Sequence, residues 1–168
     1  MLLLTVGHPS SGKSTWAAKW TGKLGVYVLE RDPFRYAITG SVRPSGAETA
    51  VAAAMIGAME AGLRDDKLVI FVDNFLSAAK RRDLYDIAEA AKVPIVLVDF
   101  LDVTAPECLK RDAERDNPAG ANVIQKSFVS FPPTKVRSLI KAWPHPIVTR
   151  HQADALIVAH RQGTRINR

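Results

Sequence analysis

The sequence predicts an α/β fold of three layers (α/β/α), in which a parallel sheet lies between two layers of helices. Short, wholly apolar runs alternate along the chain with longer segments of helical periodicity, which is the pattern of parallel strands buried on both faces. Glycine or aspartate follows several of these runs, at Gly7, Asp32, Asp73 and Asp102. Because ligands of such sheets bind beyond the carboxyl ends of the strands, we expect these four residues to converge at one edge.

The apolar runs predict the strands, because turn-forming residues such as glycine, proline or aspartate lie at or near their ends. We expect strands at residues 2–6, 26–29, 68–72, 94–100 and 146–149. The first run has no basic segment before it and leads directly into a glycine loop. It is therefore predicted to be a strand and not a signal peptide.

The segments between the strands predict helices. We expect them at residues 13–23, 47–63, 77–92, 104–115, 121–131 and 133–143, with a further short helix from residue 32. Asp32-Pro33 and Thr104-Ala105-Pro106 are typical helix starts, in which a capping side chain is followed by proline. The basic end of the chain, residues 160–168, is predicted to fray.

Composition limits the class of protein. The chain has 168 residues, of which 47% are hydrophobic and 24% are charged, and this suits one compact domain. We expect residues 1–150 to form that domain and residues 151–168 to add a C-terminal helix and basic tail to it. The apolar runs are too short to cross a membrane, and a single cysteine, Cys108, excludes an internal disulfide. The net charge of +6 is compatible with a polyanionic partner.

The most specific motif is Gly7-His8-Pro9-Ser10-Ser11-Gly12-Lys13-Ser14, which fits G-x-x-x-x-G-K-[ST] between an expected strand and an expected helix. Its glycines allow backbone N–H groups to wrap a phosphate, and the following helix adds its positive N-terminal end. We expect Lys13 to reach the β- and γ-phosphates of ATP, Ser14 to ligate Mg²⁺, and Thr15 to contact the α-phosphate. The motif predicts a nucleotide-binding P-loop.

A second strand end indicates how the nucleotide is used. The run Val69-Ile70-Phe71-Val72-Asp73 ends in a carboxylate, and Asn74 follows where an enzyme that activates water would carry a second acid. No N-K-x-D-like guanine-reading element is present, and the chain is short. The sequence therefore predicts a P-loop kinase, which transfers a phosphoryl group to an acceptor other than water.

The acceptor side is predicted from Glu30-Arg31-Asp32-Pro33-Phe34-Arg35. Asp32 stands at the end of the second strand, where its carboxylate can accept the proton of an acceptor hydroxyl. Arg35 lies one helical turn further along and can bind a phosphate of the acceptor by two parallel hydrogen bonds.

The chain resembles the phage polynucleotide 5′-kinase domain. The likeness rests on the P-loop with Thr15-Trp16-Ala17 after it, on Arg31-Asp32-x-x-Arg35, on Val72-Asp73-Asn74-x-Leu76 with Lys80-Arg81-Arg82 after it, and on Leu109-Lys110-Arg111-Asp112-Ala113-Glu114-Arg115. It covers about residues 1–131. The sequence shows no counterpart of the phosphatase domain that is fused to some members of that family.

The resemblance implies a role for each matching residue on the acceptor side. Asp32 matches the general base, and Arg35 matches the arginine that holds the phosphate of the acceptor nucleotide. Asp73 matches a carboxylate at the acceptor site, which can also reach Mg²⁺ through water. We expect Asn74 and Phe75, which follow it, to line the same acceptor site.

The resemblance also implies how the transferred phosphoryl group is stabilised. The resemblance implies a helical lid at about residues 111–121, in which Arg115 matches the arginine that neutralises the charge of the transferred phosphoryl group. Lys13, Asp32 and Arg115 are therefore the expected catalytic residues. Arg111 precedes Arg115 by four residues, so both side chains can point at one anion from the same helix face. We expect both arginines to contact ATP.

Three positions depart from the family pattern. Pro33 stands at a position that is often acidic, and Phe75 stands where a polar residue is expected, so that its ring could either join the core or stack on a base of the acceptor. Ser10 replaces a P-loop glycine, a change that is tolerable if its dihedral angles are ordinary. The basic run at residues 80–82 is equally compatible with a solvated face and with contact to a nucleic acid.

Together these observations predict an ATP- and Mg²⁺-dependent kinase of a nucleic acid hydroxyl, with the 5′-OH end of a polynucleotide as the leading acceptor. Three alternatives stay open: a phage DNA-modification kinase that acts on 5-hydroxymethyluracil bases, a kinase of a nucleoside or antibiotic, and a regulator that binds ATP and nucleic acid without catalysis. The expected partners are ATP and DNA or RNA. No membrane and no obligate protein partner are expected, and the expected location is the cytoplasm, as of a phage-infected bacterium.

Overall fold

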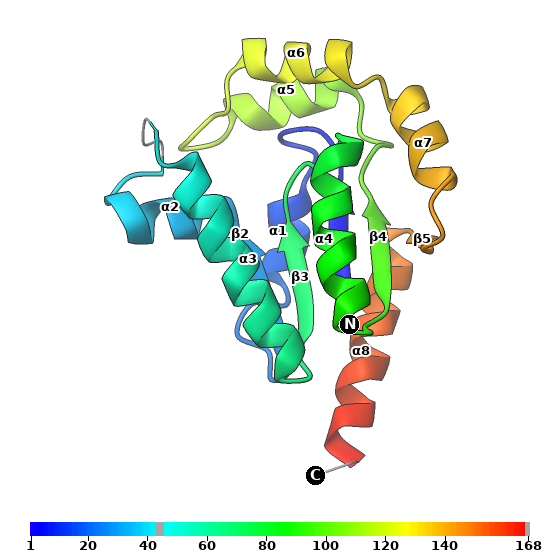
Figure 1. Cartoon of the computed structure of the whole chain (residues 1–168). Coiled ribbons are helices and arrows are strands. Elements are labelled where there is room, and N and C mark those ends of the chain that lie inside the picture. Colours follow the sequence, from blue (N-terminus) through cyan, green and yellow to red (C-terminus); the bar gives the residue numbers. More distant parts are fainter. Residues whose placement is uncertain (43–45, 167–168) are drawn as a thin grey trace.

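The predicted fold class is confirmed in a computed structural model, which describes residues 1–42 and 46–166, without the side chains of residues 78, 80 and 164–166. A five-stranded sheet forms its centre, in the order β2-β3-β1-β4-β5 (Figure 1). The strands, all paired in parallel, are β1 (Leu2–Val6), β2 (Val26–Glu30), β3 (Leu68–Val72), β4 (Ile95–Asp99) and β5 (Ile147–Val148). Each predicted strand is present, with ends that agree to within one residue.

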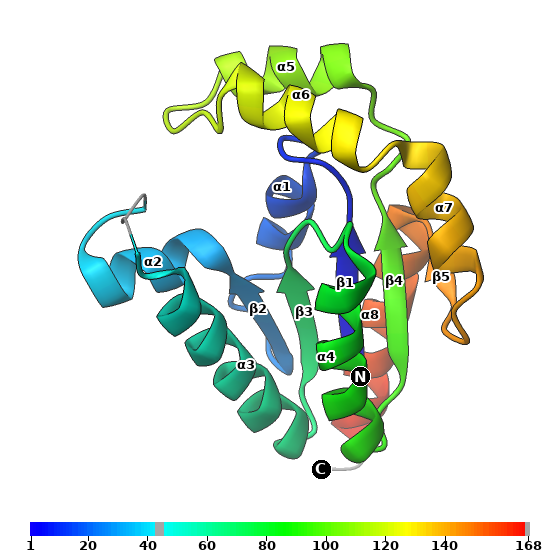
Figure 2. The ribbon, with the colours of Figure 1, turned by 45° about the horizontal axis from the view of Figure 1, so that its top comes forward.

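Helices cover both faces of the sheet. They are α1 (Lys13–Ala18), α2 (Arg31–Thr39), α3 (Glu48–Arg64), α4 (Ala78–Ala90), α5 (Ala105–Ala113), α6 (Ala121–Ser130), α7 (Pro133–Lys141) and α8 (Arg150–Ile166). Helices α3, α4 and α7 pack on one face, and α1 and α8 pack on the other. Helices α5 and α6 lie across the carboxyl ends of the strands (Figure 2).

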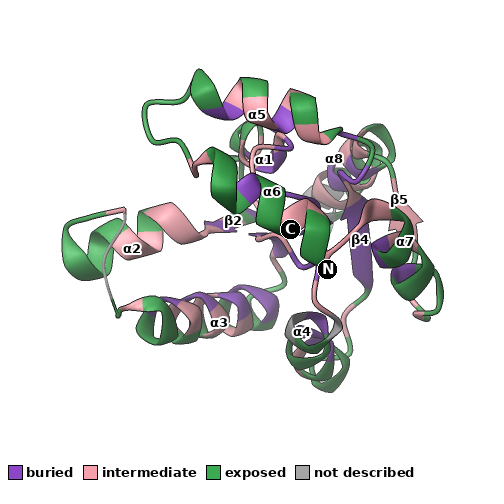
Figure 3. Cartoon of the chain, turned by 90° about the horizontal axis from the view of Figure 1, so that it is seen from above, coloured by how far each residue is buried: buried purple, intermediate pink, exposed green. Residues whose placement is uncertain are grey.

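The two faces of the sheet carry separate apolar clusters, because consecutive side chains of a strand point to opposite faces. In β1, Leu2 and Leu4 belong to the cluster beneath α3 and α4, whereas Leu3 belongs to the cluster beneath α1 and α8. The same alternation divides Phe71 from Ile70 in β3. Figure 3 shows that the buried residues gather on the strands and on the inner sides of the helices. This double burial fixes the sheet, and with it the positions of the loops at its carboxyl end.

Two predicted elements differ from the structure. Helix α1 ends at Ala18 and not at residue 23, and Gly22 follows in the left-handed conformation, with φ of 72°. The predicted fraying of residues 160–168 is wrong as far as Ile166, because α8 continues to that residue; residues 167–168 lie outside the described residues. The burial of Ala153 and Ile157 against the sheet anchors α8.

A further difference concerns the start of α2. The helix begins at Arg31 with Glu30 as its N-cap, so Asp32 lies in the first turn and is not the capping residue. Over the described part of the chain, no helix has the length and apolar character required to span a membrane.

Two glycines of α3 provide a test of how closely this helix packs on the sheet. A Cβ atom at Gly62 would lie 2.8 Å from Tyr27 Cδ2 and 3.0 Å from Val69 Cγ2, whereas one at Gly57 would meet nothing within 4 Å. We expect Gly62→Ala to lower the free energy of unfolding by about 1–3 kcal/mol through overpacking. The matched control Gly57→Ala should raise it by ~0.5–1 kcal/mol, because alanine is the better helix former. Urea denaturation measures both, and equal effects of the two variants would contradict the close approach of α3.

Candidate active site

A cavity of about 430 Å³ opens at the carboxyl end of the sheet. It is lined by the P-loop, the β2–α2 junction, the end of β3, the lid, and Val42 and Glu48, which lie between α2 and the start of α3. Its charged lining residues are Lys13, Glu30, Arg31, Asp32, Arg35, Glu48, Asp73 and Arg115. Thus Asp32 and Asp73 do converge beside the P-loop, as the sequence predicts. Asp102 does not line this cavity; it is half-exposed and pairs with Arg150.

The P-loop, residues 7–14, owes its path to two glycines. A Cβ atom at Gly7 would lie 2.6 Å from Phe100 Cβ, so no side chain fits where β1 passes the end of β4. Gly12 has φ of 95°, a conformation that favours glycine. Ser10 also has positive φ, at 60°, so the condition that its dihedral angles be ordinary is not met. Its hydroxyl donates a hydrogen bond of 2.7 Å to Asp112 Oδ1 in the lid.

Lys13 is buried at the foot of this loop. Its ammonium group donates hydrogen bonds to the carbonyl oxygens of His8, at 2.6 Å, and Gly7, at 3.1 Å. Burial lowers the pKa of Lys13 to about 8, against the opposing attraction of the Asp73 carboxylate. A phosphate in the loop would supply the anion that this buried ammonium lacks.

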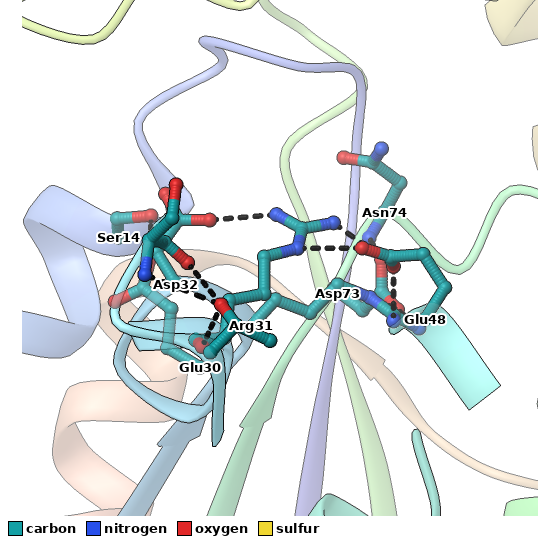
Figure 4. Close-up of polar contacts among 10 residues, drawn as sticks. Ser14, Glu30, Arg31, Asp32, Glu48, Asp73 and Asn74 are labelled. Atoms are coloured by element: carbon teal, nitrogen blue, oxygen red, sulfur yellow. Dashed lines mark hydrogen bonds and ion pairs between the residues drawn. The ribbon is translucent and has the colours of Figure 1, made fainter. Parts of the chain in front are cut away.

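Oxygen atoms suited to a divalent cation lie next to Lys13. The Ser14 hydroxyl donates a hydrogen bond to Glu30 Oε1, and Glu30 and Asp73 line the same cavity (Figure 4). Among the described residues, no group of three or more histidine, cysteine or acidic side chains could hold a metal by itself. The donor set therefore fits Mg²⁺, which binds one or two protein oxygens and completes its shell with phosphates and water. Sequence reasoning missed Glu30, although it directly precedes the Arg31-Asp32 pair.

Two arginines and three carboxylates form an ion-pair network at the acceptor end of the cavity (Figure 4). Arg35 pairs with Asp32 Oδ1 at 2.7 Å and with Glu48 through Nε at 2.8 Å. Arg31 pairs with Asp73 Oδ2 at 2.7 Å and with Glu48 Oε2 at 3.1 Å. The hydrogen bond between Arg35 and Glu48 raises the pKa of the guanidinium and lowers that of the carboxyl.

Within this network the Asp32 side chain keeps 43% of its surface exposed, so a substrate can reach it. The sequence predicted roles for Asp32, Arg35 and Asp73. It gave no role to Arg31, although Arg31 is part of the motif, and it did not indicate Glu48. Arg31 adjoins Asp32 and could have been found from that. Glu48 is the first residue of α3, and no local signal connects it to residues 31 and 35.

From here on, the name lid refers to α5, α6 and the loop between them, which is a longer segment than the predicted residues 111–121. The two arginines of this segment reach the P-loop. Arg111 Nη1 donates to the Ser11 carbonyl at 3.3 Å, and its Nε pairs with Glu107 at 2.7 Å. Arg115 Nη1 lies 3.4 Å from Ser10 Oγ and lines the cavity. Arg115 lies beyond the last residue of α5, Ala113, so the two arginines approach the loop from different segments and not from one helix face.

Phe75 and Arg81 do not take the acceptor-side positions considered for them. Phe75 is only 3% exposed and packs against Phe71 in the core, so its ring is not available to a base. Arg81 is fully buried, donates a hydrogen bond to the Phe75 carbonyl and lies 5.4 Å from the centre of the Trp143 ring. It therefore belongs neither to a solvated face nor to a nucleic-acid contact. The side chain of Lys80 lies outside the described part, and Asn74 does line the cavity.

A second cavity of about 520 Å³ lies on the other side of the P-loop. Its lining includes Gly12 and Thr15, Phe100, Arg111 of the lid, and Arg150 of α8. The Arg150 guanidinium stands 5.3 Å from the centre of the Phe100 ring. The volume of this cavity is sufficient for a nucleoside, and the cavity is lined in part by Thr15, the residue expected at the α-phosphate. The sequence analysis missed Arg150.

His8 connects the P-loop to the lid. It is fully buried, its ring stacks on Phe128 of α6 at 3.6 Å between centroids, and Nδ1 is 2.9 Å from Ser127 Oγ. Burial, helped by the charge of Lys13, lowers the pKa of His8 to about 4. The sequence does not predict these contacts, because a single histidine within the motif carries no signal of its distant partners.

The depressed pKa of His8 predicts acid sensitivity. An unfolded histidine takes up a proton near pH 6.5, whereas folded His8 stays neutral down to about pH 4. Stability contributed by this group is therefore complete above pH 6.5 and decreases as the pH falls toward 4, by up to ~3 kcal/mol. We expect His8→Phe, which keeps the ring stack, to lose less stability over this window than the wild type in denaturation series. The exposed control His151→Gln should follow the wild type; parallel curves for all three proteins would contradict the assignment.

The depressed pKa of Lys13 predicts that ATP binding is coupled to a proton. Above its pKa of about 8 the buried amine is mainly neutral, and a bound phosphate favours the charged form. At about pH 9 we therefore expect ATP binding to take up most of one proton, and uptake should decline toward neutral pH. Calorimetry in buffers of different ionisation enthalpy measures this uptake. Lys13→Gln should abolish it and the exposed control Lys23→Gln should not; uptake that is independent of pH would refute the coupling.

Comparisons with known proteins agree with this geometry. A family model described as an AAA domain (AAA_33) matches residues 2–131, and no curated protein matches the sequence significantly. A chain in the structure of the Pnkp1/Rnl/Hen1 complex is 27% identical with a TM-score of 0.58, over 66% of this chain and 38% of that one. A chain of the Pnkp1/Rnl/Hen1 RNA repair complex is 23% identical with a TM-score of 0.66, over 84% and 45%. The chain thus spans less than half the length of these two relatives.

Other solved structures share the fold along nearly the whole chain. A putative kinase from Chloroflexus aurantiacus is 14% identical with a TM-score of 0.62, over 98% of this chain and 95% of that one. Deoxyadenosine kinase from M. mycoides, at 13% identity over 98% and 100%, and gluconokinase from Sinorhizobium meliloti, at 14% over 94% and 87%, each reach 0.50. The family match extends from β1 through the end of α6 and includes the P-loop, the ion-pair network and the lid. The chain therefore belongs to the AAA domain family AAA_33, and it shares the fold of these kinases.

Proposed function

We propose that this protein is a kinase that transfers the γ-phosphoryl group of ATP to a hydroxyl of a nucleic acid, with the 5′-OH end of a polynucleotide as the leading acceptor. One observation carries the proposal. An accessible carboxylate, Asp32, lies in the same cavity as Lys13 and Ser14 of the P-loop. Two arginines, Arg31 and Arg35, lie beside it and can hold an acceptor that carries a phosphate next to its hydroxyl.

The chain's own groups can perform the transfer. Asp32 would accept the proton of the acceptor hydroxyl as its oxygen attacks the γ-phosphorus. Lys13 and Arg115 would offset the negative charge that spreads over the transferring group. Ser14, with Asp73 or Glu30 acting through water, would hold Mg²⁺, and the ion would supply positive charge to the phosphate groups.

The acceptor end is arranged to exchange one anion for another. In the absence of substrate, Glu48 receives hydrogen bonds from both Arg31 and Arg35, although half of its side chain is exposed. An acceptor phosphate at this point would take the place of the Glu48 carboxylate. Both arginines would then form hydrogen bonds to the phosphate.

Two further observations favour a polynucleotide as the acceptor. The net charge of the chain is +6, which favours association with polyanions. The relative that shares 27% of its residues is part of the Pnkp1/Rnl/Hen1 complex, and a second structure of that assembly is described as an RNA repair complex. Both observations point to a phosphorylated, chain-like acceptor.

The fold neighbours favour a second candidate, a kinase of a small molecule. Deoxyadenosine kinase and gluconokinase share this fold, and a cavity of about 430 Å³ could hold a nucleoside. The modified-base alternative receives less support, because Phe75, the residue considered for reading such a base, is buried.

A matched acceptor panel tests these candidates with γ-labelled ATP. It contains a 5′-OH oligonucleotide, a 5′-blocked duplex with internal 5-hydroxymethyluracil, a 3′-nucleotide and free nucleosides. We expect label on the oligonucleotide and the 3′-nucleotide. Asp32→Asn should reduce the rate by about 10²–10⁴-fold, because the general base is lost, while the exposed control Asp83→Asn keeps the wild-type rate.

Arg35→Ala separates the candidates further. It should raise the KM for phosphate-bearing acceptors by at least about tenfold and leave nucleoside acceptors almost unchanged. Label only on nucleosides would favour the small-molecule kinase, and label only on the blocked duplex would favour the DNA-base kinase. If the protein binds ATP but labels no acceptor, and if Asp32→Asn leaves ATP and nucleic acid binding unchanged, the protein is a regulator and not an enzyme.

A further inference from the structure

Asp112 is a buried carboxylate at the junction of the P-loop and the lid. The residue is only 3% exposed, and its carboxylate receives three hydrogen bonds from two segments, the P-loop and residues 119–120. These come from the Ser10 hydroxyl at 2.7 Å, the Ala119 N–H at 2.8 Å and the Gly120 N–H at 2.8 Å. A buried carboxylate is costly unless such donors satisfy it, so this arrangement depends on all three.

These bonds close the lid loop at residues 113–120. At its start, the Arg115 N–H donates to the Asp112 carbonyl at 3.2 Å. At its end, Ala119 and Gly120 donate to the Asp112 side chain. One residue therefore holds both ends of the segment that carries Arg115, the lid arginine of the cavity.

Ser10 connects this loop to the phosphate site. Its φ of 60° is unusual for a residue with a side chain, and the conformation directs the hydroxyl to Asp112. The same oxygen lies 3.4 Å from Arg115 Nη1. A glycine would adopt this backbone with less strain but would lack the oxygen that joins the loop to the lid.

We propose that Ser10 and Asp112 form a latch that places Arg115 over the phosphate site, so that Asp112 is a positioning residue for the transfer. The inference rests on the proposed function, in which Arg115 stabilises the transferring phosphoryl group. It assigns to residue 112 a role for which its position in the sequence gives no motif. The hydrogen bonds of Ser10, Ala119 and Gly120 outweigh the effect of burial and hold the pKa of Asp112 below its ordinary value, so the carboxylate stays charged in the latch.

The test combines kinetics with amide hydrogen exchange. We expect Asp112→Asn to lower kcat by about tenfold on the acceptor that the panel identifies, with little change in the KM of the acceptor. Ser10→Gly removes the same contact at a backbone conformation that suits glycine, so it should fold even if the first variant does not, and it should also lower kcat. The exposed neighbour Glu114→Gln is the matched control and should keep wild-type values.

The Arg115→Ala background separates positioning from stability. If Asp112 acts through Arg115, Asp112→Asn should change kcat by less than about twofold once Arg115 is absent. An equal loss in both backgrounds would overturn the proposal and leave Asp112 a structural residue only. Exchange of the peptide that spans residues 113–121 should be faster in both Ser10→Gly and Asp112→Asn, and unchanged exchange would also overturn it. Because exchange needs no acceptor, it tests the latch even if no transfer is found and the proposed function fails.

Discussion

Strand β1 pairs in parallel with β3 on one side and with β4 on the other, and the cavity is arranged around these pairings. The chain leaves β1 directly into the P-loop, so whatever follows the neighbouring strands must lie beside the phosphate site. On the β3 side, Thr5 Oγ1 donates to the Asp73 carbonyl and the Gly7 N–H donates to the Asn74 carbonyl. On the β4 side, the Phe100 N–H donates to the Val6 carbonyl, and Phe100 approaches so closely that residue 7 must be glycine. Register, and not any local motif, brings the P-loop and the carboxylate of β3 together.

The charges of the cavity are balanced before any substrate binds. Four cations, Lys13, Arg31, Arg35 and Arg115, face four carboxylates, Glu30, Asp32, Glu48 and Asp73. Most of these groups already have a partner of opposite charge, and Lys13 is held by carbonyl oxygens instead. Binding of nucleotide and acceptor must therefore exchange one set of contacts for another. The Glu48 carboxylate is half-exposed, so an incoming anion can take its place. Among the described residues, the buried Lys13 ammonium forms no ion pair, so a phosphate would supply its counterion.

The sequence was informative where the physical signal is local. Buried parallel strands appear as apolar runs, so every strand could be predicted, and the P-loop could be predicted because its glycines, lysine and serine occupy fixed spacings. Contacts between distant residues left no such signal. Glu48 binds Arg35 from the far side of a loop. Ser10 of the P-loop binds Asp112, which lies more than a hundred positions away, and His8 of the P-loop stacks on Phe128 of α6. Arg81 misleads for a related reason, since an arginine in a basic run predicts exposure and only the fold reveals its burial beside Trp143. The α8 terminus was missed because its anchor is packing on the sheet, which outweighs its polar composition.

The lid has an apolar cluster of its own, formed by Val103, Cys108 and Ile124 with Leu109 and Phe128 against them. This cluster is separate from the two that hold the sheet, and polar contacts from Ser10, Ser11 and His8 join the lid to the P-loop. Substitutions in the lid should therefore change the stability of the lid and of those contacts, and should have little effect on the stability of the sheet. Because its apolar cluster is separate from those of the sheet, the lid can change in sequence during evolution independently of the sheet. Selection can alter how substrates are enclosed while the stability margin of the whole chain is preserved.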